Sequence, residues 1–403
     1  MIISKDLEEI VLSIFSNNKY DISKVKSIDR NKTNEIINIF NHGRVEKKLL
    51  DFLEKTKIKR LWSDDLLKKL KINHMVRILN NKKIMKDFFD ISLALNRENI
   101  KFIPLKGVHI NLLNQDRFDR NIRDIDILID KKDIQKALSI LLDSGYAHKN
   151  ENNFILGDFS KMSSSLYDIP PLFNNSNTCL EIHYKILNRD DCDLSKQMLL
   201  STNKLDFEDQ EIFVGDLESL FLHLVYHASS KQGFDVGLQI IEDICTLIDA
   251  KDFDLKKAIT LSKKLNLFAE VFLFLNLIRK YKIRNIDIKR YLNFENYFNY
   301  DIAETFTSLV IYNSATQESI KIFDTNLMTL FGNVFSKGSV EYYGFSKNSL
   351  SSKIEIIVKK FLRLSRIYLR IFYKLLLYKN FRIHSRESAK ILSLMRSINR
   401  KVN

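Results

Sequence analysis

Two aspartates lie two residues apart in an otherwise apolar stretch of the sequence. Asp124 and Asp126 alternate with isoleucines between Arg123 and Ile129, which predicts a β-strand with both carboxylates on one face. Adjacent carboxylates repel each other, so a solvated surface strand is the plain alternative. A divalent cation makes the pair favourable, because Mg²⁺ takes oxygen ligands and commonly bridges carboxylates to nucleotide phosphates. The pair therefore indicates metal-dependent nucleotidyl or phosphoryl transfer.

A second alternating stretch supplies another acid. Cys179 to Ile186 alternates with a period of two, which predicts a strand with Glu181 and His183 on one face. Other elements expected around these strands are a short strand at 101–105 that feeds a turn at Lys106-Gly107, helices at 108–113 and 133–142, a helix stop at Gly145-Tyr146, and a short strand at 211–214.

The remaining sequence is mostly helical in period, and it contains only three prolines and ten glycines among 403 residues. We expect a predominantly helical α+β fold with a small mixed sheet framed by N- and C-terminal helical regions. The expected divisions are a helical region at 1–98, a core at 99–215, a second helical region at 216–350 and a basic helical tail at 351–403.

The order of the motifs resembles the polymerase-β nucleotidyltransferase superfamily, and most closely its uncharacterised nucleotidyltransferase branch. The resemblance covers roughly residues 35–270. The matching segments are Leu105-Lys106-Gly107, Arg120, Asp124-Ile-Asp126-Ile-Leu-Ile, Gly145-Tyr146, Glu181-Ile-His183-Tyr184, Leu222-His223-Leu-Val-Tyr-His227-Ala and Glu242-Asp243-Ile244. Each segment is weak alone, but their order is fairly specific.

The resemblance implies a metal site for Mg²⁺ or Mn²⁺ formed by the catalytic carboxylates Asp124, Asp126 and Glu181. It further implies a nucleotide-binding set of Lys106, Gly107, Arg120, His183, His227 and Asp243. Two features depart from the superfamily. The first turn lacks its usual hydroxyl, so Lys106 is expected to contact phosphate instead, and Glu181 replaces the usual third aspartate.

Several of these residues have structural alternatives. Arg120 can form a salt bridge with Asp116 or Asp119, and Asp243 can belong to a structural ion pair rather than to a phosphate-binding one. His183 is either a pocket residue or a hydrogen-bonded core histidine. His223 and His227 have the i, i+4 spacing of a zinc pair, but no third ligand accompanies them, and packing or a pocket role is preferred.

The net charge of +14 is concentrated in the tail, where residues 351–403 contain 14 lysines or arginines and two glutamates. This segment is expected either to pack on the protein or to bind a polyanion or an anionic membrane surface. No apolar run has transmembrane length, the N-terminus is unlike a signal peptide, and the three cysteines have no metal-type or disulfide spacing. The expected location is cytoplasmic or membrane-peripheral.

The leading hypothesis is a nucleotidyltransferase of the EC 2.7.7 type that moves a nucleoside monophosphate from an NTP, with ATP expected, to a hydroxyl or phosphate of a sugar, metabolite, peptide or protein. The alternative is a non-catalytic nucleotidyltransferase-like module that binds nucleic acid or an anionic surface through 351–403. Phosphotransfer on the same scaffold is a third, weaker hypothesis.

Overall fold

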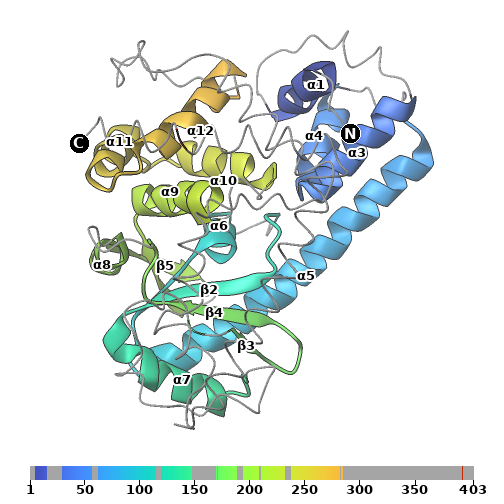
Figure 1. Ribbon diagram of the computed structural model, residues 1–403. Coiled ribbons are helices and arrows are strands. Elements are labelled where there is room, and N and C mark those ends of the chain that lie inside the picture. Colours follow the sequence, from blue (N-terminus) through green and yellow to red (C-terminus); the bar gives the residue numbers. More distant parts are fainter. Residues whose placement is uncertain are drawn as a thin grey trace, which may run out of the picture.

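The computed structural model describes residues 5–15, 30–56, 62–114, 119–147, 169, 171–187, 194–207, 210–231, 237–281, 283–284 and 393. Helices predominate among the described residues, and they surround a four-stranded sheet; a two-stranded sheet accompanies it (Figure 1). Apart from Ser393, the basic tail predicted at 351–403 lies outside the described residues.

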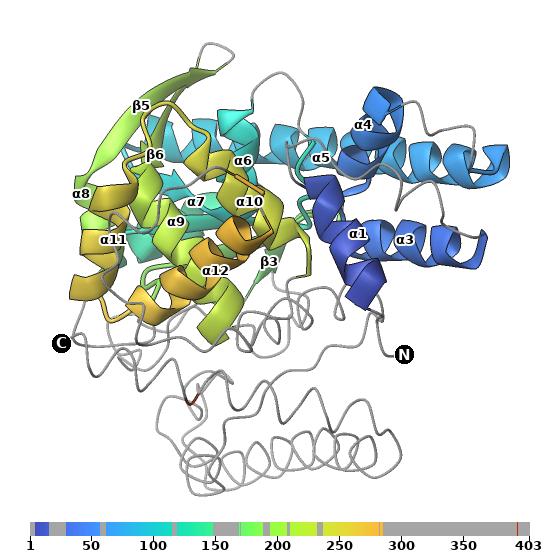
Figure 2. The same cartoon turned by 90° about the horizontal axis from the view of Figure 1, so that it is seen from above.

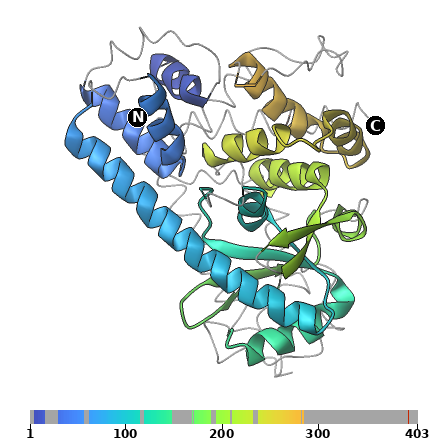
Figure 3. The same ribbon diagram turned by 180° about the vertical axis from the view of Figure 1, so that it is seen from behind.

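In the described part of the N-terminal region, four helices precede the sheet: α1 (Lys5–Phe15), α3 (Arg30–His42), α4 (Glu46–Thr56) and α5 (Asp64–Arg97). The first three pack through one apolar face each, as their 3.6-residue period dictates. Ser63 caps α5 by accepting a hydrogen bond from the Leu66 amide. This long helix runs from the N-terminal helices along the back of the sheet (Figure 3), so it joins the two parts of the fold.

The central sheet has four strands in the order β1-β2-β4-β3. β1 (Phe102–Pro104) pairs antiparallel with β2 (Asp124–Ile129), β2 pairs parallel with β4 (Cys179–His183), and β3 (Leu172–Phe173) closes the far edge antiparallel to β4. Two connecting helices complete the core, α6 (Lys106–Leu113) and α7 (Ile134–Asp143). The sheet is therefore mixed, as predicted.

The two faces of β2 serve different purposes. Ile125, Ile127 and Ile129 are fully buried against α5 and α7, in the core beneath the sheet. Asp124, Asp126 and Leu128 alternate with them and so point to the opposite face, where Leu128 joins a second core with α6 and the C-terminal helices. In Figure 1, α7 lies on one side of the sheet and α6 and α9 on the other.

The chain continues with α8 (Leu194–Leu200) and the hairpin of β5 (Thr202–Phe207) and β6 (Gln210–Gly215). Helices α9 (Leu217–Tyr226), α10 (Gln239–Ile248), α11 (Leu255–Lys264) and α12 (Phe268–Lys280) then stack over the α6 face (Figure 2), and a π turn (His227–Lys231) follows α9. Among the described residues, no helix combines the length and apolarity needed to cross a membrane.

The fold class predicted from the sequence is confirmed: a mainly helical α+β architecture with a small mixed sheet. The predicted stop after α7 is also observed. Gly145 adopts a left-handed φ of 86°, and the amides of Gly145 and Tyr146 bond back to Leu142 and Leu141. Glycine suits this position because a side chain would strain the left-handed backbone.

Candidate metal and nucleotide site

Parallel pairing of β2 and β4 brings the acids of two distant segments together. Asp126 stands opposite Glu181 in the register, and Leu128 stands opposite His183. The side chains of Asp126, Glu181 and His183 each offer a ligand atom, and these atoms all lie within 4.8 Å of one another. Two carboxylates and an imidazole at this spacing are a donor set that can bind a divalent cation.

Asp126 is the centre of this group. Its Oδ1 accepts a hydrogen bond of 2.5 Å from the Lys106 ammonium and one of 2.8 Å from His183 Nε2, while His183 Nε2 also lies 3.6 Å from Glu181 Oε2. A carboxylate cannot donate, so Nε2 must carry the hydrogen in this arrangement. His183 therefore orients Asp126, and it would coordinate a metal through Nε2 only after changing its tautomer.

The pKa values of the three carboxylates shift in different directions. Burial alone would raise the pKa of Asp126, but Lys106 and His183 outweigh it and hold that pKa well below its usual range. Burial and then the Asp126 charge raise the pKa values of both Asp124 and Glu181. The repulsion expected among these carboxylates therefore raises the pKa values of Asp124 and Glu181. It does not raise that of Asp126, because Lys106 and His183 lie beside Asp126.

Asp124 lies on the same face as Asp126, one pleat away. It is not among the three residues whose ligand atoms converge within 4.8 Å. Its charge nevertheless acts on both Lys106 and Glu181, whose pKa values it raises. Asp124 is therefore a neighbour of the group rather than one of its converging members.

Helix α6 begins directly at the site. Lys106, its first residue, has a left-handed φ of 46°, an uncommon conformation for a residue with a side chain. The preceding Leu105 provides no side-chain cap, so the first amides of α6 keep their affinity for an anion. A strained lysine at an uncapped helix start is an arrangement that suits phosphate.

Gly107 is required for packing at the start of α6. A Cβ atom at this position would lie 2.1 Å from Arg120 Nη1 and 2.2 Å from Ile122 Cγ2, both of which are impossibly close. Gly107 therefore lets the Arg120 guanidinium lie against the helix. Its predicted contact with nucleotide stays a prediction.

Arg120 forms a bidentate ion pair with Asp243 of α10, through Nε–Oδ1 at 3.1 Å and Nη2–Oδ2 at 2.9 Å. The side chains of Arg120 and Asp243 are 18% and 3% exposed. Arg120 and Asp243, both predicted to bind nucleotide, are thus paired with each other. This is the structural ion pair that was the alternative role for Asp243. Asp116 lies outside the described residues, and the ion-pair partner that the described part of the chain gives Arg120 is Asp243.

Buried amides hold the backbone that leads into β2. Asn81 of α5 and Asn111 of α6 both donate to the Arg120 carbonyl, at 2.9 and 2.8 Å, and both are fully buried. Gln239 of α10 donates to the Asn121 carbonyl at 2.9 Å. Three helices therefore fix the segment that precedes Asp124.

The histidines of α9 approach the same region. His223 is buried, its Nδ1 has no hydrogen-bond partner among the described residues, and its ring lies edge-on to His227, 6.1 Å between centroids. Burial and then the charges of Lys106, His227 and His183 lower its pKa well below the usual range. His223 is thus a neutral side chain close to the site. The sequence favours packing or a pocket role for it, and no spacing signal distinguishes the two.

The structure therefore gathers Asp124, Asp126, Glu181, His183 and Lys106 on one face of the sheet, over its two central strands. Arg120 and Asp243 form a separate pair beside Gly107, and His227 meets the region through His223. This arrangement does not test the roles in catalysis and nucleotide binding that the sequence predicts for these residues, and those roles remain predictions.

A family of proteins described as uncharacterised nucleotidyltransferases matches residues 29–281, which include the whole of the site. The chain belongs to this family. The extent of the match agrees with the sequence resemblance and identifies the protein as nucleotidyltransferase-like.

A solved structure, the antigenic nucleotidyltransferase-like protein from Paracoccidioides brasiliensis, is similar at 16% identity, over 52% of this chain and 91% of that one, with a TM-score of 0.33. No curated protein matches the sequence significantly.

Proposed function

We propose that this family member is a metal-dependent nucleotidyltransferase that moves a nucleoside monophosphate from an NTP, ATP foremost, to an acceptor hydroxyl or phosphate. The observation that carries the proposal is the register of β2 and β4, in which Asp126 faces Glu181 with Asp124 on the same face. Family membership supports a transferase, and the group of acids supports a divalent cation.

Asp126 and Glu181 would hold the cation, with Asp124 beside them, and carboxylate oxygens favour Mg²⁺ or Mn²⁺. When bound, such an ion would neutralise the charge that builds on the transferred phosphoryl group. His183 keeps Asp126 oriented through its 2.8 Å hydrogen bond. A fixed carboxylate needs less reorganisation when substrate arrives.

Lys106 would release Asp126 and bind a phosphate oxygen of the nucleotide, together with the uncapped amides of α6. In the transfer, an acceptor oxygen forms a bond to the α-phosphorus and the bond to pyrophosphate breaks. The proton of the acceptor hydroxyl goes to Glu181, whose carboxylate is one-third exposed and has a raised pKa.

The direct test is Mn²⁺ binding by the full chain, measured by electron paramagnetic resonance. Asp126→Asn should weaken binding strongly, because it removes a charged ligand and leaves the Lys106 ammonium in place. Asp143→Asn, an equivalent change at the exposed end of α7, should leave it unchanged. Equal Mn²⁺ affinity of Asp126→Asn and the wild type would refute the proposed metal site.

A further inference from the structure

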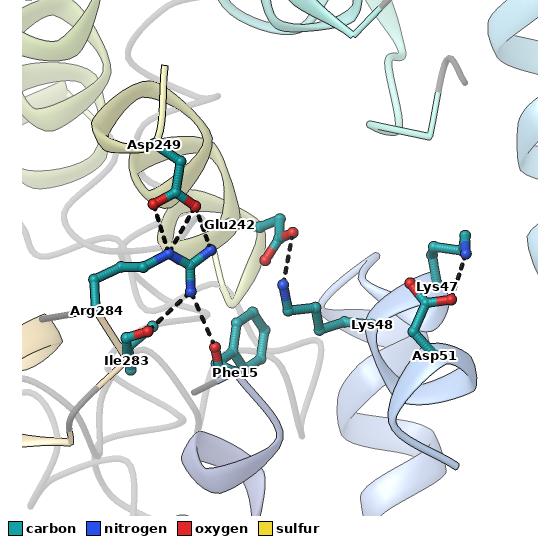
Figure 4. Close-up of polar contacts among 8 residues, drawn as sticks. All are labelled: Phe15, Lys47, Lys48, Asp51, Glu242, Asp249, Ile283 and Arg284. Carbon is teal, nitrogen blue, oxygen red and sulfur yellow. Dashed lines mark hydrogen bonds and ion pairs between the residues drawn. The ribbon is translucent and has the colours of Figure 1, made fainter. Parts of the chain in front are cut away.

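A polar pocket of about 230 Å³ lies between the N-terminal helices and the core. Its walls come from the start of α4, the side of α6, the Arg120 segment and α10. The ion pair between Lys48 of α4 and Glu242 of α10, 3.1 Å long, spans two of these walls (Figure 4). A volume of this size suits a small metabolite rather than a whole nucleotide.

The charged side chains of the lining largely neutralise one another. Five carboxylates and four lysine or arginine residues line the pocket, in addition to His74. Lys47 pairs with Asp51, Lys48 with Glu242, and Arg120 with Asp243. The lining as a whole is therefore not a basic patch, and a highly charged triphosphate would meet as much repulsion as attraction.

Arg44 is the exception. Its guanidinium makes no hydrogen bond or ion pair with any residue in the described part of the chain, although the residue is half-buried. Burial and the neighbouring Arg123, Arg120 and Arg77 lower its pKa to about 10. Among the described residues, other cations lie close to this arginine, and the charge of Asp124 acts on it without forming an ion pair.

The backbone at Arg44 is also unusual. It has a left-handed φ of 59° in the turn between α3 and α4, at a position where glycine is the favoured residue. The glycine of this turn stands one residue earlier, at Gly43. The chain therefore accepts a conformational cost to keep an arginine at the pocket, which strain at functional sites often reflects.

Glu242 offers the complementary group. Its Oε1 accepts the Lys48 bond, whereas its Oε2 is buried without a hydrogen-bond partner among the described residues. A buried carboxylate oxygen without a donor is costly. A ligand that brings a hydroxyl or amine hydrogen into the pocket would satisfy it.

The pocket adjoins the proposed transfer site. Arg120 lines it and at the same time lies against Gly107 at the start of α6, and Ile110 and Asn114 of the same helix continue the lining. Asp124 links the two regions electrostatically, since its charge acts on Arg44 as well as on Lys106. A ligand in the pocket would therefore share Arg120 and α6 with the proposed transfer site and lie within the electrostatic range of Asp124.

We infer that this pocket binds the acceptor, and that the acceptor is a small sugar or polyol carrying one phosphate or carboxylate group. The anionic group would pair with Arg44, and a hydroxyl would donate to Glu242 Oε2. The triphosphate group of a nucleotide fits less well, because it has no hydrogen to donate to Glu242 Oε2 and more negative charge than Arg44 can balance, and the other lysine and arginine side chains described in the lining are already in ion pairs. The role of this ligand as the acceptor rests on the proposed function, whereas its binding in the pocket does not.

Calorimetry on the full chain without nucleotide or metal tests the pocket directly. The probes are glucose 6-phosphate and glucuronate, with glucose and inorganic phosphate as single-group controls. At least one of the two anionic sugars should bind more tightly than either control. Arg44→Gln should then weaken it roughly 10- to 100-fold, as expected for losing one charge-assisted contact, while Arg97→Gln, the same change at the exposed far end of α5, should have no effect.

Glu242→Gln supplies an independent variant. Glutamine keeps one oxygen that can accept from Lys48, but an NH2 donor replaces the second oxygen, which is the proposed acceptor for the ligand hydroxyl. It should weaken the anionic sugar and leave inorganic phosphate unaffected. The inference is overturned if neither anionic sugar binds. It is also overturned if, in a separate titration with ATP, Arg44→Gln weakens the binding of ATP instead of the binding of the sugar, which would make the pocket a triphosphate site. Mn²⁺ binding by the Arg44→Gln protein separates failure of this inference from failure of the proposed function: unchanged Mn²⁺ affinity leaves the proposed metal site intact even if the pocket does not bind an anionic sugar.

Discussion

Two buried ion pairs flank the start of α6, and they contrast sharply. Lys106–Asp126 and Arg120–Asp243 each join a cation that the sequence assigned to phosphate with a carboxylate of the site. The first pair lies among further acids, Asp124 and Glu181, and leaves the region with excess negative charge. The second is balanced by itself and is held by two hydrogen bonds in fixed geometry.

This difference indicates which cation is available for substrate. Lys106 is a point charge on a flexible stem, and a bound metal would compete with it for Asp126. Arg120 is fixed by Asp243, by its own backbone contacts and by close packing on Gly107. We therefore expect Lys106 to exchange partners during turnover and Arg120 to position the strand that carries Asp124.

The largest expected effect is on stability, at the balanced pair. Arg120→Ala should reduce the free energy of unfolding by about 3–5 kcal/mol, because it leaves Asp243 buried without its partner. Denaturant unfolding of Arg120→Ala, Asp243→Ala and the double variant measures this. A double variant as unstable as the sum of the singles would mean that the two side chains do not act as a pair.

A third pair sharpens the comparison through pH. Glu46 is 2% exposed beside Arg77, at 2.6 Å, and burial raises its pKa to about 7 despite that arginine. A folded-state pKa above the unfolded value near 4.5 means that its stabilising contribution is present below pH 4.5 and is lost as pH rises to about 7. The loss is roughly 3 kcal/mol at most.

Glu46→Gln should remove this contribution. The difference in unfolding free energy between the wild type and Glu46→Gln, followed from pH 4.5 to 7.5, should therefore change in favour of the variant as pH rises. A flat difference across the window would show that Glu46 is ionised throughout.

At the exchangeable pair, Lys106→Met should separate two affinities. The variant removes a cation from an acidic group, so Mn²⁺ should bind as well as or better than in the wild type. ATP should bind roughly 10- to 100-fold more weakly, because a charged phosphate contact is lost. Both affinities are measurable by calorimetry, and a parallel loss of metal and ATP would contradict an exchanging lysine.

The smallest expected effect distinguishes the two aspartates of β2. Asp126→Asn should lower stability by about 1–3 kcal/mol, since it weakens the bonds from Lys106 and His183. Asp124→Asn should be neutral or stabilising by less than about 1 kcal/mol, because it relieves the burial of a charge and the repulsion from Asp126, which together raise the pKa of Asp124. Thermal or urea unfolding at pH 7 compares them; equal destabilisation would contradict this assignment of the repulsion.

Local periodicity was sufficient to predict β1, β2, β4, β6 and the connecting helices α6 and α7, but it gave no strand for β3 or β5. The alternation around Asp124 and Glu181 and the glycine stop at Gly145 depend only on neighbouring residues, and the structure agrees at each. Membership of the family followed from the order of these same motifs.

Partnerships across long sequence separations could not be predicted in this way. The Arg120–Asp243 pair joins residues 123 positions apart, and the contact of Lys106 with Asp126 depends on how α6 packs over β2. Arg44 belongs to the turn between α3 and α4 and to no motif, so only the assembled pocket reveals its place there. His183 was assigned to nucleotide, whereas its position beside Asp126 is set by strand register.

The central claim is that the protein transfers a nucleoside monophosphate, with the α-phosphate of the NTP, at a metal site that contains Asp126. Its most direct test incubates the full chain with α-labelled or γ-labelled ATP, Mg²⁺ or Mn²⁺ and a host-cell lysate, and follows the label into acceptor. The wild type should transfer the α label and release the γ label as pyrophosphate, and Asp126→Asn should be slower by roughly 10²–10³-fold or more. Transfer of the γ label to acceptor, or undiminished transfer by Asp126→Asn, would contradict the account.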